Sequence, residues 1–87
     1  MKKLVLLSYV LLKKNSFGDQ HNTVLDYVNH NECALALDIL CETVIENKIT
    51  IDRKQLFEIK ELAKIYSFGS IKISVNSFRL LELLLNN

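Results

Sequence analysis

The chain has 87 residues, which is enough for one domain with a single hydrophobic core and leaves little room for a deep pocket. It contains no proline and only two glycines. This argues against an all-β fold, because such folds need turn residues at about every 8 to 12 positions. The net charge is only +1, but the charges are unevenly distributed along the chain.

Three segments differ in charge. Residues 1–14 contain four lysines and no acid, a charge of +4. Residues 15–47 contain six carboxylates and neither lysine nor arginine, a charge of −6. Residues 48–87 contain seven basic and four acidic residues, a charge of +3, so the three segments sum to +1. The acidic segment cannot neutralise itself, so it must pair with basic parts of the same fold or face a basic partner.

A first helix is predicted over residues 3–14. Lys2 and Lys3 precede an apolar run, as in a signal peptide, but lysines and Asn15 follow where a cleavage site of small residues would be needed. The run is also far shorter than the roughly 20 apolar residues that span a bilayer. We therefore expect a central, buried helix rather than a signal peptide or a membrane-surface segment. Residues 15–19 have the composition of a turn.

A second helix is predicted over residues 20–29, and a third begins after Asn31, a favourable N-cap residue. Glu32 would then lie in the first turn of the third helix, where a negative charge suits the helix dipole. Tyr27 is expected near the edge of the second helix. The residues expected to face inward are Val24, Leu25 and Val28 in the second helix, and Ala36, Leu37, Leu40, Cys41 and Val44 in the third.

The outward face of the third helix is predicted to carry a row of carboxylates. Asp38, Glu42 and Glu46 are spaced four residues apart and therefore share one face, to which Leu35 also belongs, with Glu32 near its edge. Like charges at this spacing repel each other by about 0.2–0.5 kcal/mol per pair, so the row does not stabilise the helix. Exposed carboxylates are commonly an ordinary solvated surface, but the lack of balancing cations in this segment makes a binding surface a strong alternative.

The fourth helix has the clearest predicted start. Asp52 is the expected N-cap residue and Gln55 its reciprocal capping-box partner, with Ile51 and Leu56 as the hydrophobic staple. The residues expected to face inward are Leu56, Ile59, Leu62, Ala63 and Tyr66, and those on the opposite flank, toward another helix or a partner, are Phe57 and Ile65. The helix is expected to end near Gly69, and a last, largely apolar helix capped by Ser74 is predicted over about 75–86.

These elements predict an all-α protein in which residues 1–87 form a single compact bundle of four to five short helices. Cys33 and Cys41 are eight residues apart on one helix. That spacing separates them by roughly 12 Å along the axis, more than the Cα separation of about 7 Å that a disulfide allows. Both are expected to be reduced and half-buried.

No motif for catalysis or for metal or cofactor binding stands out. His30, Glu32 and Cys33 are similar to part of a zinc deaminase motif, but the chain has no proline and no Cys-x-x-Cys pair. His21 is a conceivable third metal ligand, yet its spacing does not require it to converge on the others. No serine lies in a Gly-x-Ser-x-Gly turn, and there is no glycine-rich phosphate loop. We therefore expect no catalytic, metal-binding or cofactor-binding residues.

The segment from residue 27 to residue 66 carries a family pattern. The residues that form it are Tyr27, His30 and Glu32 (Tyr-x-x-His-x-Glu), Ala36, Leu37 and Leu40 (Ala-Leu-x-x-Leu), Glu46, Asp52 as a helix cap, and Leu62-Ala63. In these features, which cover somewhat under half of the chain, the sequence resembles the MafI-type family of small immunity proteins from bacterial polymorphic toxin systems. The apolar first helix departs from the family pattern.

The resemblance implies an inhibitor and not an enzyme. Immunity proteins of this kind, including those of contact-dependent growth inhibition, bind the toxic domain of a cognate toxin in the cytoplasm and block it. The toxin is often a ribonuclease, including the EndoU-like type. A ribonuclease active site is electropositive because it binds phosphates, so an acidic face would be steered onto it and occlude its substrate. The residues expected to contact the toxin are Glu32, Leu35, Asp38, Glu42 and Glu46.

Two other functions remain open from the sequence. A small helical DNA-binding regulator or antitoxin would use the basic residues of the fourth helix, which Glu58 and Glu61 interrupt. Those basic residues are Arg53, Lys54, Lys60 and Lys64. A self-associating module is the other alternative, since the first and last helices have excess apolar surface, and a homodimer is compatible with every function considered. Otherwise we expect a cytoplasmic protein that contacts the toxin domain and neither nucleic acid nor a membrane.

Overall fold

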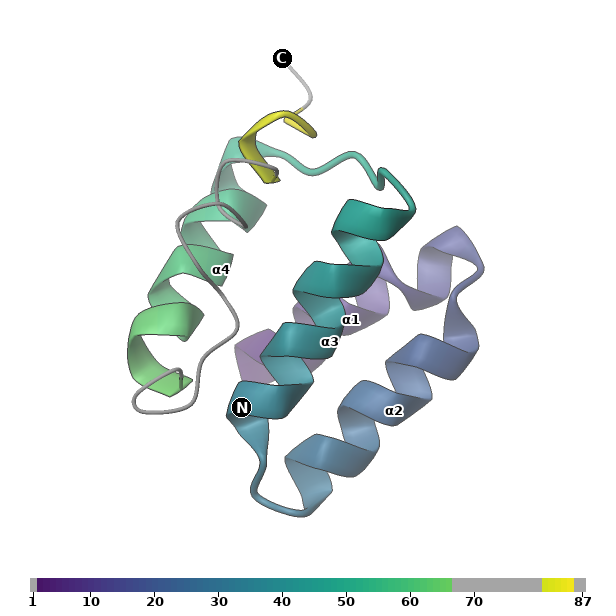
Figure 1. The fold of residues 1–87 in the computed structure, drawn as a ribbon, viewed down its shortest axis with the longest axis vertical. Helices are drawn as coiled ribbons and strands as arrows, with labels where there is room; N and C mark the ends of the chain where they lie inside the picture. Colours follow the sequence, from purple (N-terminus) through teal and green to yellow (C-terminus); the bar gives the residue numbers. More distant parts are fainter. Residues whose placement is uncertain (1, 67–80, 86–87) are drawn as a thin grey trace.

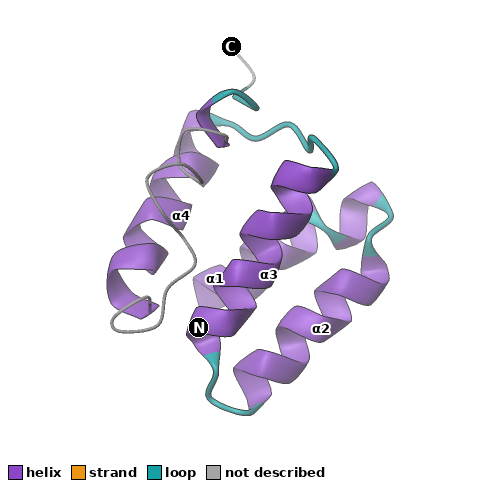
Figure 2. Ribbon diagram, in the orientation of Figure 1, coloured by secondary structure: helices purple, strands orange, loops and turns teal. Residues whose placement is uncertain are grey.

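The computed structural model describes residues 2–66 and 81–85. In chain order, the helices of this part are α1 (Lys2–Leu11), the short 3-10 helix η1 (Lys13–Asn15), α2 (Gly18–Asn29), α3 (Cys33–Glu46) and α4 (Arg53–Tyr66). The described residues contain no strand, and their one β-type contact is an isolated bridge between Ile51 and Leu85 (Figure 2). The predicted all-α bundle is therefore confirmed.

The helices pack in two layers. α2 and α3 lie side by side and antiparallel, and α4 packs against the other side of α3, as Figure 1 shows. α1 crosses behind them and contacts all three. The view in Figure 1 is down the shortest axis of a molecule that measures 35 × 28 × 20 Å. The outer faces of α1 and α3 therefore point to opposite sides of the molecule.

One hydrophobic core lies between the layers. The predicted inward stripe of α3 is confirmed: Ala36, Leu37, Leu40, Cys41 and Val44 are all buried. In α2, Val24 and Val28 are buried as predicted, and Tyr27, expected near the edge, is half-buried. Leu25, expected to face inward, is only half-buried. The other helices contribute Leu4, Leu7, Leu11 and Leu12, and Leu56, Ile59, Leu62 and Ala63.

The predicted start of α3 is wrong by one step. Glu32, and not Asn31, is the N-cap residue, and its side chain makes no capping hydrogen bond. Asn31 has a φ of 59° and instead terminates α2. Its N–H donates to Val28 O at 3.1 Å, and the N–H of Glu32 donates to Tyr27 O at 2.8 Å. Asparagine tolerates this left-handed conformation, so Asn31 ends α2 and does not act as the N-cap of α3.

Two further helix ends use the same geometry without glycine. Ser16 has a φ of 73° and Lys48 a φ of 50°. The N–H of the following residue then reaches back in each case, from Phe17 to Leu12 O at 2.8 Å and from Ile49 to Val44 O at 3.0 Å. Three helices of this glycine-poor chain thus end at a non-glycine residue in the left-handed conformation, which has a conformational energy cost.

The start of α4 is formed as predicted. The N–H of Gln55 donates to Asp52 Oδ1 at 2.7 Å, and the N–H of Asp52 donates to Gln55 Oε1 at 2.9 Å, which completes the capping box. Ile51 and Leu56, the expected staple, are both buried. Phe57 on the opposite flank is 62% exposed, so no described helix covers it.

The prediction of a central, buried first helix is confirmed for one side of α1 and wrong for the other. One face of α1 is buried, but Leu6 is 62% exposed, and Tyr9 and Val10 are exposed as well. The buried residues of α1 (Leu4, Leu7, Ser8 and Leu11) share one side of the helix, so its other apolar side lies in solvent. The helix also ends at Leu11 and continues as η1, not as one helix to residue 14.

The predicted last helix can be assessed only at its end. Residues 81–82 are helical, the chain then turns, and the N–H of Ile51 donates to Leu84 O at 3.0 Å. A helix continuing to residue 86 is therefore wrong, because this contact with the segment before α4 ends it earlier. Leu81 is fully buried. Gly69, Ser74 and the remainder of that prediction lie outside the described residues.

Candidate interaction surface on α3

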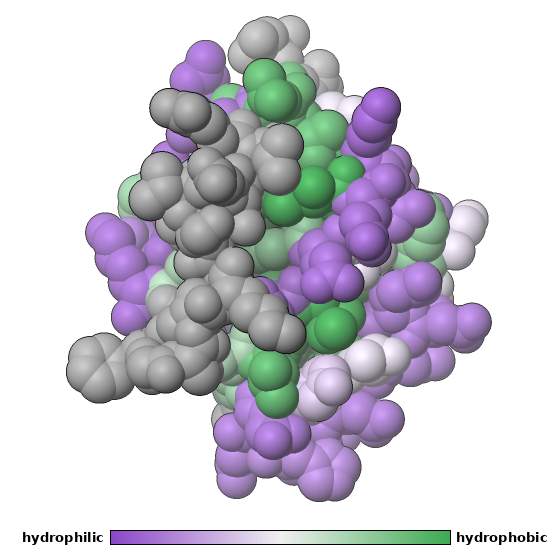
Figure 3. Space-filling view, viewed as in Figure 1, coloured by the Kyte–Doolittle hydropathy of each residue, from purple (hydrophilic) through white to green (hydrophobic). Residues whose placement is uncertain are grey.

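The outer face of α3 carries the five residues predicted from spacing. We call Glu32, Leu35, Asp38, Glu42 and Glu46 the acidic stripe. Glu32, Glu42 and Glu46 are exposed, Asp38 is half-buried, and Leu35 is 37% exposed. Because the buried residues of α3 occupy the opposite side of the helix, the stripe faces away from the core. Figure 3 looks onto the side of the molecule where α3 lies in front. Hydrophilic side chains cover much of the right half of this view, where α2 and the upper part of α3 lie, and apolar side chains show between them and the grey atoms.

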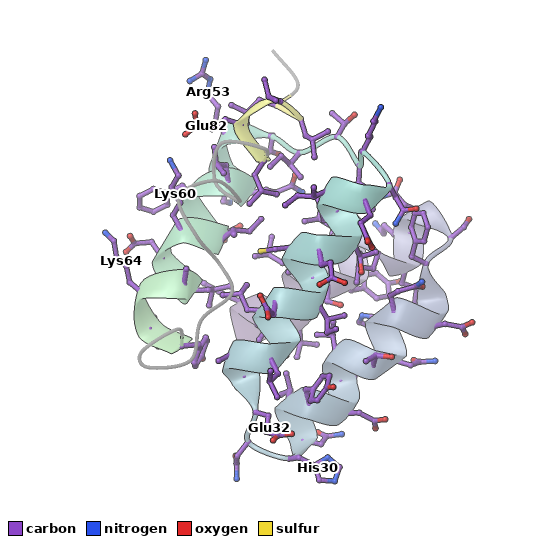
Figure 4. All side chains as sticks on the ribbon, viewed as in Figure 1. His30, Glu32, Arg53, Lys60, Lys64 and Glu82 are labelled. Atoms are coloured by element: carbon purple, nitrogen blue, oxygen red, sulfur yellow. The ribbon has the colours of Figure 1, made fainter. Side chains whose placement is uncertain are left out.

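The exposed carboxylates of the stripe are not neutralised by the described fold. Glu32, Glu42 and Glu46 form no ion pair with any lysine or arginine in residues 2–66 and 81–85. Glu32 lies beside His30 at the turn between α2 and α3 (Figure 4). The Nδ1–H of His30 is already used, since it donates to Asp26 O at 2.7 Å. Glu32, Glu42 and Glu46 are therefore three exposed carboxylates without an ion pair within residues 2–66 and 81–85.

The charges at the C-terminal end of α3 also oppose its helix dipole. No acidic residue lies in its first turn, no basic residue lies in its last turn, and Glu46 is its final residue. A negative charge at a helix C-terminus costs about 0.3–1 kcal/mol at an exposed site. The helix dipole favours Glu32 at the N-cap, but stability of the helix alone does not explain Glu42 and Glu46.

The basic residues of α4 are partly neutralised. Lys60 Nζ lies 3.3 Å from Glu82 Oε1, and Lys64 Nζ lies 3.2 Å from Glu61 Oε2. Figure 4 shows Arg53, Lys60 and Lys64 along the outer side of α4, with Glu82 close to Lys60. Binding to nucleic acid would need a continuous row of cations on α4. That row is interrupted by Glu82 and Glu61, which pair with Lys60 and Lys64.

The residues that resemble a metal site do not converge. No group of three His, Cys, Asp or Glu side chains within residues 2–66 and 81–85 could hold a metal ion. Cys33 and Cys41 are free thiols, Cys33 half-buried as predicted and Cys41 more deeply buried than predicted. Burial, and to a lesser degree the nearby Asp38, raises the pKa of Cys41 to about 12. Cys41 is therefore an unreactive core residue.

A buried pair that the sequence did not reveal joins α1 to α2. Ser8 Oγ lies 2.7 Å from His21 Nδ1, and both side chains are buried. The ring of Tyr9 contacts that of His21 edge-on, with centroids 6.0 Å apart. A serine next to a histidine is also the start of a nucleophilic site, but Ser8 is fully buried, so no substrate reaches its hydroxyl in this structure. The signal in the sequence was Ser8 itself: a polar side chain on the inward face of an apolar helix needs a hydrogen-bond partner when it is buried.

Comparison with protein-family models, with curated proteins and with solved structures gave no match. No helix within the described residues is long and apolar enough to cross a membrane.

Proposed function

We propose that this chain is an immunity protein that binds and neutralises a cognate secreted toxin domain in the cytoplasm. The toxin we propose is a ribonuclease, for which the EndoU-like type is one candidate. The proposal rests on the resemblance to the MafI-type family together with the acidic stripe. The observation that carries it is the exposure of Glu32, Glu42 and Glu46 on one face without ion pairs in the described part of the chain.

The proposed mechanism is occlusion of a basic active site. Leu35 to Glu46 covers eleven helical steps, roughly 16 Å, which is comparable to several phosphates of an RNA strand. The carboxylates would occupy the positions of those phosphates, and the exposed Leu35 would supply an apolar contact among them. Opposite charges on the two partners would also raise the association rate and make it sensitive to salt.

The proposal is tested by calorimetric titration against the toxin domain encoded immediately upstream, together with a ribonuclease assay. We expect tight binding that abolishes RNA cleavage. Glu42→Lys should weaken binding by at least about tenfold, because it places a cation against a cationic site. Asp26→Lys is the matched control: it changes an exposed carboxylate on α2 by the same charge and should leave the affinity unchanged.

Three results would contradict the proposal. The first is the absence of binding to that toxin domain, or of a toxin gene beside this one. The second is equal weakening by Glu42→Lys and Asp26→Lys, which would mean that the stripe is not the contact. The third is salt-sensitive binding to duplex DNA that depends on Arg53 and Lys54, which would favour the regulator that uses α4.

A further inference from the structure

The outer face of α1 combines cations with apolar side chains and contains no acid. Every exposed residue of α1 is a lysine or an apolar or aromatic residue. Together with the two lysines of η1, which are also exposed, they form what we call the α1 face: Lys2, Lys3, Leu6, Tyr9, Val10, Lys13 and Lys14. A helix face in solvent is normally polar, so this composition needs an explanation.

The cations lie close to the exposed apolar groups. The ammonium groups of Lys13 and Lys14 lie 5.9 and 5.8 Å from the centroid of the Tyr9 ring. The Tyr9 ring is held in place by its edge-on contact with His21, so the position of the ring at this end of the α1 face is fixed. An amphipathic aromatic ring flanked by lysines is typical of side chains at the level of lipid headgroups.

Leu6 stands between two open grooves. The groove toward α2 is lined by Lys2, Val5, Leu6, Val28, Asn29 and Asn31, so among the described residues its only charged lining residue is a lysine. The groove toward α4 has two lysines, Lys3 and Lys54, and two acids, Asp52 and Glu58. Leu6 is therefore a protruding apolar residue, and the described surface beside it toward α2 combines apolar residues and two asparagines with a single cation and no acid.

A second copy of this chain fits the α1 face poorly. Two α1 helices packed antiparallel would bring Lys2 and Lys3 of one copy against Lys13 and Lys14 of the other. Packed parallel, they would bring identical lysines together. Like charges at such a contact oppose association, and α1 has no acid to compensate them. The occupant must therefore be anionic and must also accept apolar side chains.

We propose that the α1 face binds the surface of an anionic lipid bilayer. α1 lies along the plane of the headgroups, with Leu6, Tyr9 and Val10 entering the boundary of the acyl chains and the lysines contacting phosphate groups. Apolar contact and attraction between lysines and acidic lipids add together in such an arrangement. The sequence predicted no membrane contact because it placed this helix in the centre of the bundle, which the exposure of Leu6 contradicts.

The acidic stripe does not oppose this binding. It lies on α3, across the 20 Å dimension of the molecule from α1. At physiological ionic strength the screening length is about 8 Å, so its repulsion from a surface under α1 is largely screened. The bound molecule would hold the stripe away from the bilayer. The inference is independent of the partner proposed for α3.

The test is co-sedimentation of the full chain with phosphatidylcholine vesicles, with and without phosphatidylglycerol. We expect binding only to the vesicles that contain phosphatidylglycerol, and weaker binding as salt is raised. Lys3→Glu should reduce the partition coefficient by at least about fivefold, the effect of one lysine near such a surface. Leu6→Ser should reduce it by a similar factor through lost insertion.

Matched controls exist on α4. Phe57→Ser removes an apolar side chain with the same 62% exposure as Leu6, and Arg53→Glu makes the same charge change as Lys3→Glu. Both should leave vesicle binding unchanged. Circular dichroism of each variant establishes that it is folded, and all four positions are exposed.

Three outcomes would overturn the proposal. One is no binding to the phosphatidylglycerol vesicles at low salt. Another is binding that Leu6→Ser does not weaken and that duplex DNA competes away, which would make the face a general polyanion surface. The third is a concentration-dependent increase in mass by light scattering that Lys3→Glu and Leu6→Ser abolish, which would mean that another copy covers the face.

Discussion

Ser8 and His21 are the polar contact through which α1 is held against α2. Their hydrogen bond is buried, and a buried donor or acceptor left without its partner costs about 1–3 kcal/mol. The pKa of His21 is lowered from its usual value of 6.5, first by burial and second by the positive charge of Lys13. The folded protein therefore favours the neutral ring.

This pair predicts that the protein loses stability in mild acid. The unfolded chain takes up a proton on His21 as the pH falls through 6.5, whereas the folded chain does so only at lower pH. The contribution is thus fully present above 6.5 and is lost as the pH falls from there through the lowered pKa of the folded state. Urea unfolding at about pH 8 and about pH 5 should show a lower midpoint at the acidic pH. His21→Gln should remove much of that difference, and an unchanged difference would assign it to other groups.

Lys48 illustrates a second constraint at the scale of single residues. It terminates α3 with a φ of 50°, a conformation that costs a non-glycine residue about 1–3 kcal/mol. Lys48→Gly should therefore stabilise the protein by about 0.5–1 kcal/mol, after the larger entropy of glycine in the unfolded chain is subtracted. Asn31→Gly should gain less, since asparagine tolerates the conformation. Lys48→Ala is the control for the lost charge, and a gain as large as that of Lys48→Gly would refute the backbone explanation.

Among the helices, α4 and α1 mark the limits of what the sequence predicts. The start of α4 was predictable because Asp52 and Gln55 satisfy each other within one turn, with no contribution from the rest of the fold. Which side of α1 is exposed could not be predicted from the sequence. The two sides of this helix are similarly apolar, and only the packing of the other helices decides which of them is buried. The prediction of Asn31 as the N-cap of α3 failed for a related reason. Asparagine suits both the start of a helix and a left-handed residue at its end, and here Asn31 ends α2.

The candidate sites divide in the same way. The acidic stripe follows from spacing along one helix, so its position was predictable. The Ser8–His21 pair and the α1 face depend on how α1 docks against its neighbours. Sequence periodicity does not encode that docking in α1, where every position except Ser8 is apolar, aromatic or lysine.

The position of Glu46 in α3 predicts a conflict between the stability of the protein and its binding to the toxin domain. Glu46 lies at the negative end of the helix dipole and follows Glu42 by one turn. Glu46→Gln should therefore raise the free energy of unfolding of the free protein by about 0.3–1 kcal/mol. The same substitution should weaken binding to the toxin domain. Unfolding curves and calorimetric titration of one preparation measure both effects. A loss of stability would show that Glu46 has a structural role in α3.

At the scale of the whole molecule, the two proposed surfaces face opposite ways. The α1 face carries four lysines and no acid, whereas the acidic stripe lies across the 20 Å dimension on α3. This separation of charge would allow a chain of net charge +1 to bind the proposed anionic surface on one side and the proposed cationic partner on the other. Neither surface requires a change in the other.

The separation predicts that the two binding activities can be removed one at a time. Lys3→Glu should reduce the partition coefficient onto phosphatidylglycerol vesicles by at least about fivefold. It should leave the affinity for the toxin domain within about twofold, because the screening length of about 8 Å is well below the thickness of the molecule. Glu42→Lys should have the reverse pattern. Wild-type protein already bound to vesicles should still capture the toxin domain, which co-sedimentation of the three components measures. Competition between vesicles and toxin would mean that both ligands use overlapping surfaces, and the assignment of one ligand to each side would then be wrong.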